Sequence, residues 1–143
     1  MAVRIPSWAA QEEAPFWEGI ARAELRVQGC TRCGRLRFPP RPFCPQCNWP
    51  DAVWRPMSGR ASLWSFVIAH PPLMPPFAEI APYNVIVAAL DEDPRIRMVG
   101  NLLAAPGGAI NEVKPDQIRI GARLMVVFSA GPGELTLPRW MYE

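Results

Sequence analysis

Four cysteines in the pattern C-x2-C-x10-C-x2-C constrain this 143-residue chain more than any other feature. Cys30 and Cys33 form the first pair, and Cys44 and Cys47 form the second. Each C-x2-C pair can turn two thiolates toward one point, and two pairs complete the tetrahedral sulfur shell that suits zinc. Gly34, directly after the first pair, is a typical turn residue. The spacing predicts one structural zinc ion, because four protein ligands leave no position for water or substrate.

Three alternatives for the cysteines remain open from the spacing. Two disulfides would suit an oxidising compartment, but the N-terminal sequence has no apolar segment followed by a small-residue cleavage site. Iron in a rubredoxin-like site uses the same ligands, although that fold usually separates its pairs by more residues. A redox C-x-x-C would not need two copies so close together. We expect zinc, in a cytoplasmic protein.

Proline is unusually frequent, at 18 of 143 residues, and falls between short apolar runs. Such spacing disfavours long helices and suits short strands joined by rigid loops. The strands predicted from apolar and β-branched runs are 61–69, 83–90, 96–103, 124–128 and 134–137. Five short strands with one longer connection predict a mainly β fold with an oligonucleotide/oligosaccharide-binding (OB) barrel.

Within the first predicted strand, strict alternation places side chains on two faces. One face carries Leu63, Ser65 and Val67. The other carries Trp64, Phe66 and Ile68.

The predicted domains are a helical arm over residues 1–28, a zinc ribbon over 29–56, and an OB barrel with a C-terminal tail over 57–143. The arm is the segment before the cysteines. Pro15 suits a first helical turn, and Phe16, Trp17 and Ile20 recur at roughly helical spacing. Gly19 counts against the helix. Two interpretations are open: the helix packs on its own barrel, or its aromatic side chains hold a partner.

Four arginines surround the cysteine pairs, at positions 32, 35, 37 and 41. They can offset the net −2 charge of a zinc–tetrathiolate cluster. Alternatively, they form a basic patch for an anionic ligand such as the phosphates of coenzyme A.

The sequence argues against an autonomous enzyme of a familiar class. His70 is the one histidine and has no evident triad partner, and the metal occupies every thiol. No glycine-rich phosphate-binding motif is present. No apolar run approaches the roughly 20 residues of a membrane-spanning helix.

The loop Pro71-Pro72-Leu73-Met74-Pro75-Pro76-Phe77 is stiff, apolar and uncharged. Loops are normally exposed, and an exposed apolar loop is usually covered by a partner or a ligand. The loop is therefore either an interface or ligand wall, or a segment folded onto its own barrel.

Several segments, taken in order, resemble one known family. They are Phe16-Trp17-Glu18-Gly19, Cys30-Thr31-Arg32-Cys33-Gly34, Phe38-Pro39-Pro40-Arg41-Pro42, Cys44-Pro45-Gln46-Cys47, Ser58-Gly59-Arg60-Ala61, Ala81-Pro82-Tyr83, Arg119-Ile120-Gly121 and Leu137-Pro138-Arg139. The chain is similar, from about residue 15 to 139, to the acyl-CoA-associated zinc-ribbon/OB-fold family, long described as a domain of unknown function.

The resemblance implies an N-terminal helical arm, a rubredoxin-like zinc ribbon and an OB barrel. It implies a non-catalytic subunit that joins a thiolase-fold partner (a thiolase, aldolase or acyltransferase) in a hetero-oligomer and helps to form its acyl-CoA or CoA site. Only the four zinc ligands carry over directly from the family pattern. Candidate ligand or partner contacts are Phe16, Trp17, Trp64, Phe66, Phe77, Tyr83, Arg119, Arg123 and Arg139.

Two other functions compete with this interpretation. A stand-alone acyl-CoA carrier would bind acyl-CoA without any partner. A single-stranded nucleic-acid module would stack bases on Trp64 and Phe66. Against nucleic acid stand the single lysine, Lys114, and the formal charge of +2, which zinc–thiolate formation brings to about zero.

Overall fold

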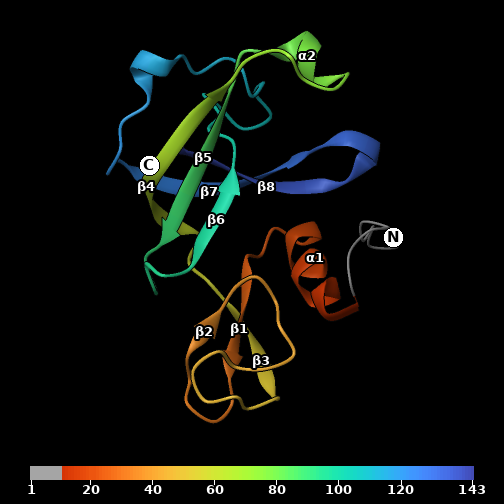
Figure 1. The fold of residues 1–143 in the computed structure, drawn as a ribbon, viewed down its shortest axis with the longest axis vertical. Coiled ribbons are helices and arrows are strands. Elements are labelled where there is room, and N and C mark those ends of the chain that lie inside the picture. The colour runs from red at the N-terminus through yellow and green to blue at the C-terminus, as the bar shows by residue number, and fades with distance from the viewer. Residues whose placement is uncertain (1–10) are drawn as a thin grey trace. The chain divides into compact units, whose positions relative to one another are not determined.

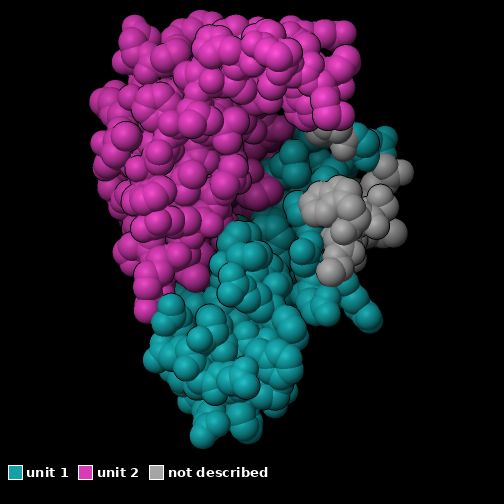
Figure 2. Space-filling view, viewed as in Figure 1, with its two compact units in different colours: residues 1–59, 130–137 teal, residues 60–129, 138–143 magenta. Residues whose placement is uncertain are grey.

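The computed structural model describes residues 11–143, so the first ten residues of the predicted arm lie outside the described part. The chain divides into two compact units (Figure 2). Unit 1 comprises residues 1–59 and 130–137, and unit 2 comprises residues 60–129 and 138–143. The fold is mainly β, with one short N-terminal helix, a four-cysteine ribbon and a curled five-stranded sheet.

Unit 1 is built on a three-stranded antiparallel sheet in the order β2-β1-β3 (Figure 1). The strands are β1 (Arg26–Cys30), β2 (Leu36–Arg37) and β3 (Ala52–Pro56). Gln28 pairs with Arg37 on one side of β1 and with Trp54 on the other. This register places the first cysteine at the end of the central strand, where the chain turns into the metal-binding loops.

The predicted helix is present as α1 (Ala14–Ala21), preceded by the 3-10 turn η1 (Gln11–Glu13). Proline stands in its first turn, as expected. Phe16 is 6% exposed, and its ring lies 5.5 Å from that of Phe38 in the ribbon. Gly19 is accommodated for a steric reason: a Cβ there would lie 2.7 Å from the Glu24 carbonyl oxygen. The close approach of the following chain explains a glycine that the helical pattern alone disfavours.

Unit 2 contains the predicted barrel sheet, in the order β6-β5-β4-β7-β8. The elements from residue 60 onward are β4 (Arg60–Ala69), α2 (Phe77–Ile80), β5 (Tyr83–Leu90), β6 (Arg97–Gly100), η2 (Pro115–Gln117), β7 (Arg123–Ala130), η3 (Pro132–Glu134) and β8 (Thr136–Tyr142). Of these, η3 and the first two residues of β8 are counted with unit 1. The sheet curls until Leu102 and Trp140 form a parallel bridge. Trp140 N–H donates to the Asn101 carbonyl at 3.0 Å, and Leu103 N–H donates to the Trp140 carbonyl at 2.8 Å. These bonds join the two ends of the sheet, as an OB barrel requires.

The predicted alternation along β4 is wrong beyond Leu63. The register with β5 shifts between Leu63 and Ser65, so Trp64 is an extra residue in a β-bulge. A bulge moves all following side chains to the opposite face. Phe66 therefore pairs with Ile86, which is fully buried, whereas Val67 is 62% exposed. Trp64 and Phe66 were predicted to share a face, but Trp64 is exposed and Phe66 is half-buried.

Two predicted strand boundaries also need correction. The strand expected over 96–103 is shorter, because the chain leaves β5 after Gly100 to reach β8. The closing strand expected over 134–137 runs instead over Thr136–Tyr142, and η3 occupies its predicted start. Both differences follow from barrel closure, which is a long-range pairing.

Asn84 lies fully buried in β5 and links two loops to the sheet. Its amide nitrogen donates to the carbonyl oxygens of Leu102 at 2.9 Å and Ile110 at 3.1 Å. Its Oδ1 accepts the Leu102 backbone N–H at 2.6 Å. A polar side chain in an apolar strand is thus satisfied by three backbone groups.

Across residues 11–143, no helix combines the length and the apolar character that a membrane crossing would need.

Candidate metal centre and contact residues

The four cysteine sulfurs converge at one end of unit 1. All four Sγ atoms lie within 4.8 Å of one another. Sγ of Cys30 is 3.6 Å from Sγ of Cys47, and Sγ of Cys33 is 3.6 Å from Sγ of Cys44. Tetrahedral zinc with bonds of about 2.3 Å separates its sulfurs by roughly 3.8 Å, whereas a disulfide needs about 2.05 Å. The cysteines are therefore positioned to bind one metal ion, and they are not paired as disulfides.

Two similar turns create this geometry. The residue after each C-x2-C pair has a positive φ: Gly34 at 76° and Asn48 at 61°. Gly34 N–H donates to the Cys30 carbonyl at 3.0 Å, and Asn48 N–H donates to the Cys44 carbonyl at 2.9 Å. Asparagine tolerates this conformation better than most side chains. Asn48 was missed from the sequence, although its place after the second pair mirrors that of Gly34.

Backbone N–H groups favour thiolates at this centre. Hydrogen bonds from Cys33 and then Arg32 lower the pKa of Cys30, against the effect of burial. Hydrogen bonds from the backbone N–H groups of Cys47 and then Gln46 lower the pKa of Cys44 to about 6, although burial opposes them. The pKa of Cys47 is raised to about 11: the Trp49 backbone N–H lowers it, but burial and the neighbouring sulfurs outweigh that effect. Crowded sulfurs cannot all ionise unaided, so the site matches the chemistry of a divalent cation with four thiolate ligands.

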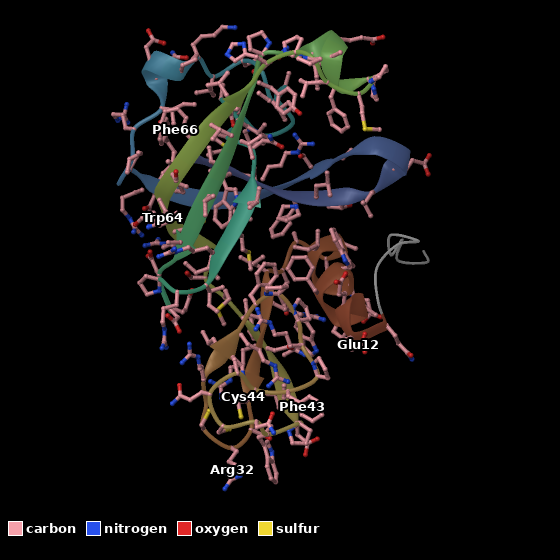
Figure 3. All side chains as sticks on the ribbon, in the orientation of Figure 1. Glu12, Arg32, Phe43, Cys44, Trp64 and Phe66 are labelled. Carbon is pink, nitrogen blue, oxygen red and sulfur yellow. The ribbon has the colours of Figure 1, made fainter. Side chains whose placement is uncertain are left out.

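The four arginines around the cysteines have separate environments. Arg32 lies over the Trp49 ring at 5.2 Å, and Arg35 donates to Gln46 at 2.7 Å. Arg37 is 3% exposed, and Arg41 is exposed. Figure 3 shows Arg32 and Phe43 at the same end of the ribbon as Cys44. The arrangement does not gather all four guanidinium groups into one basic patch.

The aromatic contact candidates fall into buried and exposed sets. Phe16 and Trp17 are buried in the described structure, at 6% and 9% exposure, so they offer little surface to a partner. Trp64 is 49% exposed, with the Arg97 guanidinium 3.7 Å from its ring centre. Phe77 is 44% exposed, and its ring lies 6.2 Å from that of Tyr83. The proline-rich loop before Phe77 is mainly exposed. Phe66 is half-buried on the inner face.

Within residues 11–143, the three predicted phosphate contacts have separate environments. Arg119 is exposed and lies over the Tyr142 ring at 4.7 Å. Arg123 forms ion pairs with Asp91 and Glu143. Burial lowers the pKa of Arg139, and its Nε is buried without a hydrogen-bond partner. Arg119 is the member of the set whose charge remains open to a ligand.

The Asp91–Arg123 pair makes stability depend on pH. The hydrogen bond from Arg123 holds the pKa of Asp91 below its ordinary value, with burial opposing it. Since the unfolded chain binds this proton more readily, the stabilisation is present above the unfolded pKa of about 3.9 and is lost as pH falls through the folded value. We expect Asp91→Asn to lower the urea midpoint at pH 7 and to flatten its decline between pH 5 and pH 2.5.

The matched control is Asp116→Asn, an exposed change in η2 that should leave the pH profile unchanged. Parallel acid profiles for wild type and Asp91→Asn would contradict this account of the pair.

Comparison with known proteins agrees with the geometry. Residues 17–52 match the family model "ChsH2, rubredoxin-like zinc ribbon domain", and residues 54–129 match "ChsH2, C-terminal OB-fold domain". The chain belongs to the ChsH2 zinc-ribbon and OB-fold family. The four cysteines of its zinc ribbon are the residues positioned to hold one metal ion.

Relatives of this ChsH2-family chain include subunits and scaffolds. A probable enoyl-CoA hydratase alpha subunit of Thermomonospora curvata is 33% identical over 93% of this chain and 38% of its own length. A "3-oxo-4,17-pregnadiene-20-carboxyl-CoA hydratase alpha subunit" of Mycobacterium tuberculosis is 33% identical over 68% of this chain and 30% of its own length. This chain therefore spans about a third of these two relatives. A DUF35 domain-containing scaffold protein of Methanothermobacter thermautotrophicus is 30% identical over 82% of this chain and 81% of its own length.

Solved structures support the same family fold. A chain of the "Ltp2-ChsH2(DUF35) aldolase" superposes with a TM-score of 0.80 at 30% identity, covering 96% of this chain and 98% of that one. A DUF35-family protein of unknown function from Sulfolobus solfataricus superposes with a TM-score of 0.65 at 12% identity, over 96% of this chain and 90% of its own, which shows the fold alone.

Proposed function

We propose that this chain is a non-catalytic subunit that supports a thiolase-fold partner acting on acyl-CoA thioesters. In this role it helps to complete the acyl-CoA site and holds the complex together in the cytoplasm. The observation that carries the proposal is the structural match to a chain of the "Ltp2-ChsH2(DUF35) aldolase". The match covers 96% of this chain and 98% of that one. The scaffold name of an archaeal relative adds support.

The chemistry of the metal centre agrees with a supporting role. Four protein ligands close the coordination shell, so the metal has no open position at which to polarise a substrate. The chain has four cysteines, all positioned as ligands of the metal, and one histidine. His70 is exposed after β4. In this proposal, the nucleophile or base that cleaves or forms the carbon–carbon bond belongs to the partner.

The exposed outer face of the sheet in unit 2 is the proposed partner surface. Trp64 and Arg97 form a stacked pair there, at 3.7 Å. Val67 and Val99 are 62% and 69% exposed on the same sheet. Val67 pairs with Val85, and Val99 pairs with Val87, so the register places these side chains on one face. Exposed tryptophan and arginine set among apolar side chains are the usual anchors of protein interfaces. The proline-rich loop and Phe77 are a second candidate contact.

The test is reconstitution with a thiolase-fold aldolase or thiolase from the same organism. We expect a stoichiometric complex whose acyl-CoA cleavage exceeds that of the partner alone. Trp64→Ala should weaken assembly about thirtyfold, because losing an interface anchor costs ~2 kcal/mol. Trp49→Ala is the matched control: Trp49 is also exposed and lies beneath an arginine, but it belongs to the ribbon. Zinc content is measured in both variants.

A chain that binds acyl-CoA tightly alone and forms no complex would overturn the subunit proposal in favour of a carrier. Complex formation that is insensitive to Trp64→Ala would reject only the proposed surface.

A further inference from the structure

A pocket of about 330 Å³ lies within unit 1, and none of the four cysteines lines it. Its lining includes Gln28, Arg37, Arg41 and Trp54, together with Glu12 and Asp51. Its volume is at the lower end of the range for small-molecule sites, which is roughly 300–1,000 Å³. The pocket therefore has room for a small ligand or for one end of a larger one.

The buried guanidinium of Arg37 is the unusual feature of this pocket. Arg37 is 3% exposed, and its Nε donates to Gln28 Oε1 at 2.9 Å. Its Nη1 is buried without any hydrogen-bond partner. No ion pair joins it to a carboxylate within residues 11–143. A buried charge with an unmet donor is costly, so its presence beside a pocket calls for a compensating anion.

Gln28 fixes the guanidinium in place. Gln28 is itself 7% exposed, and its Oε1 also accepts the backbone N–H of Arg41 at 2.9 Å. This shared acceptor ties β1 and β2 to the loop that carries Arg41. The Arg41 side chain is exposed, so it can move toward a ligand that enters beside Arg37.

The other lining groups limit the charge and shape of the ligand. Glu12, in η1 (Figure 3), and Asp51 are both exposed carboxylates. They balance the two arginines in formal charge and disfavour a multiply charged anion. Trp54 is half-buried, and prolines 15, 42 and 50 add apolar wall. An anion with a single charge and an apolar body fits this combination.

We propose that the pocket binds a small monocarboxylate. Its carboxylate accepts a hydrogen bond from the guanidinium of Arg37 and another from the side chain of Arg41, and both bonds are assisted by charge. Its apolar body lies against Trp54 and the prolines. This site is independent of the proposed partner surface, which lies in unit 2.

Benzoate is the probe, titrated into the zinc-loaded full chain by calorimetry and by saturation-transfer NMR. We expect saturable one-to-one binding. Arg37→Met should reduce affinity at least tenfold while the urea midpoint stays equal or rises, because the change removes an unsatisfied buried charge. That opposite response of binding and stability separates a ligand-binding arginine from a structural one. Arg41→Ala should weaken binding severalfold and keep the backbone bond to Gln28.

Arg35→Ala is the control, since Arg35 donates to Gln46 and does not line the pocket. It should retain wild-type affinity. The proposal is overturned if wild type shows no saturable binding, if Arg41→Ala or a folded Arg37→Met binds benzoate as wild type does, or if adenosine 3′,5′-bisphosphate binds more tightly than benzoate. None of these results bears on assembly with the partner, so the two proposals fail separately.

Discussion

Replacing Cys44 by serine should abolish zinc binding and destabilise unit 1. Cys44 is 2% exposed, and its sulfur is one of four that converge within 4.8 Å. A serine hydroxyl is a poor replacement for thiolate at a zinc–sulfur centre. In small metal domains, the free energy of zinc binding, roughly 10–16 kcal/mol, is also folding free energy. The ribbon holds only short strands around the site, so it has little core to replace that contribution.

The measurement is zinc per chain by mass spectrometry, together with limited tryptic digestion. Zinc should fall from about one ion per chain to nearly none, and cleavage should become rapid after Arg32, Arg35 and Arg37, which lie between β1 and β3. Phe43→Ser is the matched control, because Phe43 precedes Cys44 and is 52% exposed. It should retain zinc and resist trypsin. Full zinc content in Cys44→Ser would contradict the assignment of the centre.

Replacing Asn84 by leucine should unfold much of unit 2, although the two side chains have similar volumes. The change removes every hydrogen bond that the side chain makes to Leu102 and Ile110. Leaving buried backbone groups without partners costs about 1–3 kcal/mol each. Two such groups, the N–H and the carbonyl of Leu102, imply a loss of roughly 2–6 kcal/mol, a large fraction of the ~5–15 kcal/mol that stabilises a typical domain. The Ile110 carbonyl still accepts the Asn84 backbone N–H at 3.4 Å.

Urea denaturation measures this loss when unfolding is followed by far-ultraviolet circular dichroism of the β-sheet. Asn111→Leu is the control, because Asn111 is half-buried and its side chain donates one bond, to the Ile80 carbonyl at 3.0 Å. It should cost about 1 kcal/mol. Equal midpoints for the two variants would show that the Asn84 bonds do not anchor the barrel ends.

Local signals predicted the parts of the fold that local chemistry determines. The cysteine spacing identified the four sulfurs because each pair forms its own turn. The β-branched run identified β5 at its observed bounds, Tyr83–Leu90. The helical spacing of Phe16, Trp17 and Ile20 identified the buried side of α1.

Features that depend on distant partners could not be predicted in this way. The bulge at Trp64 becomes visible only through the register with β5. The extent of β8 depends on the pairing of Trp140 with Leu102. The roles of Asn84 and Arg37 depend on the burial of their side chains, which the sequence around them does not determine. For Asn84, the only local sign of burial was its place within an apolar run.

We expect this zinc-ribbon/OB chain to work as a subunit of a larger complex. Native mass spectrometry of the tagged chain, isolated from its own host at moderate salt, tests this expectation most directly. We predict a discrete hetero-oligomer that contains a thiolase-fold protein, with one zinc ion for each copy of this chain. A lone chain carrying zinc at all salt concentrations, with no partner mass, would contradict this expectation.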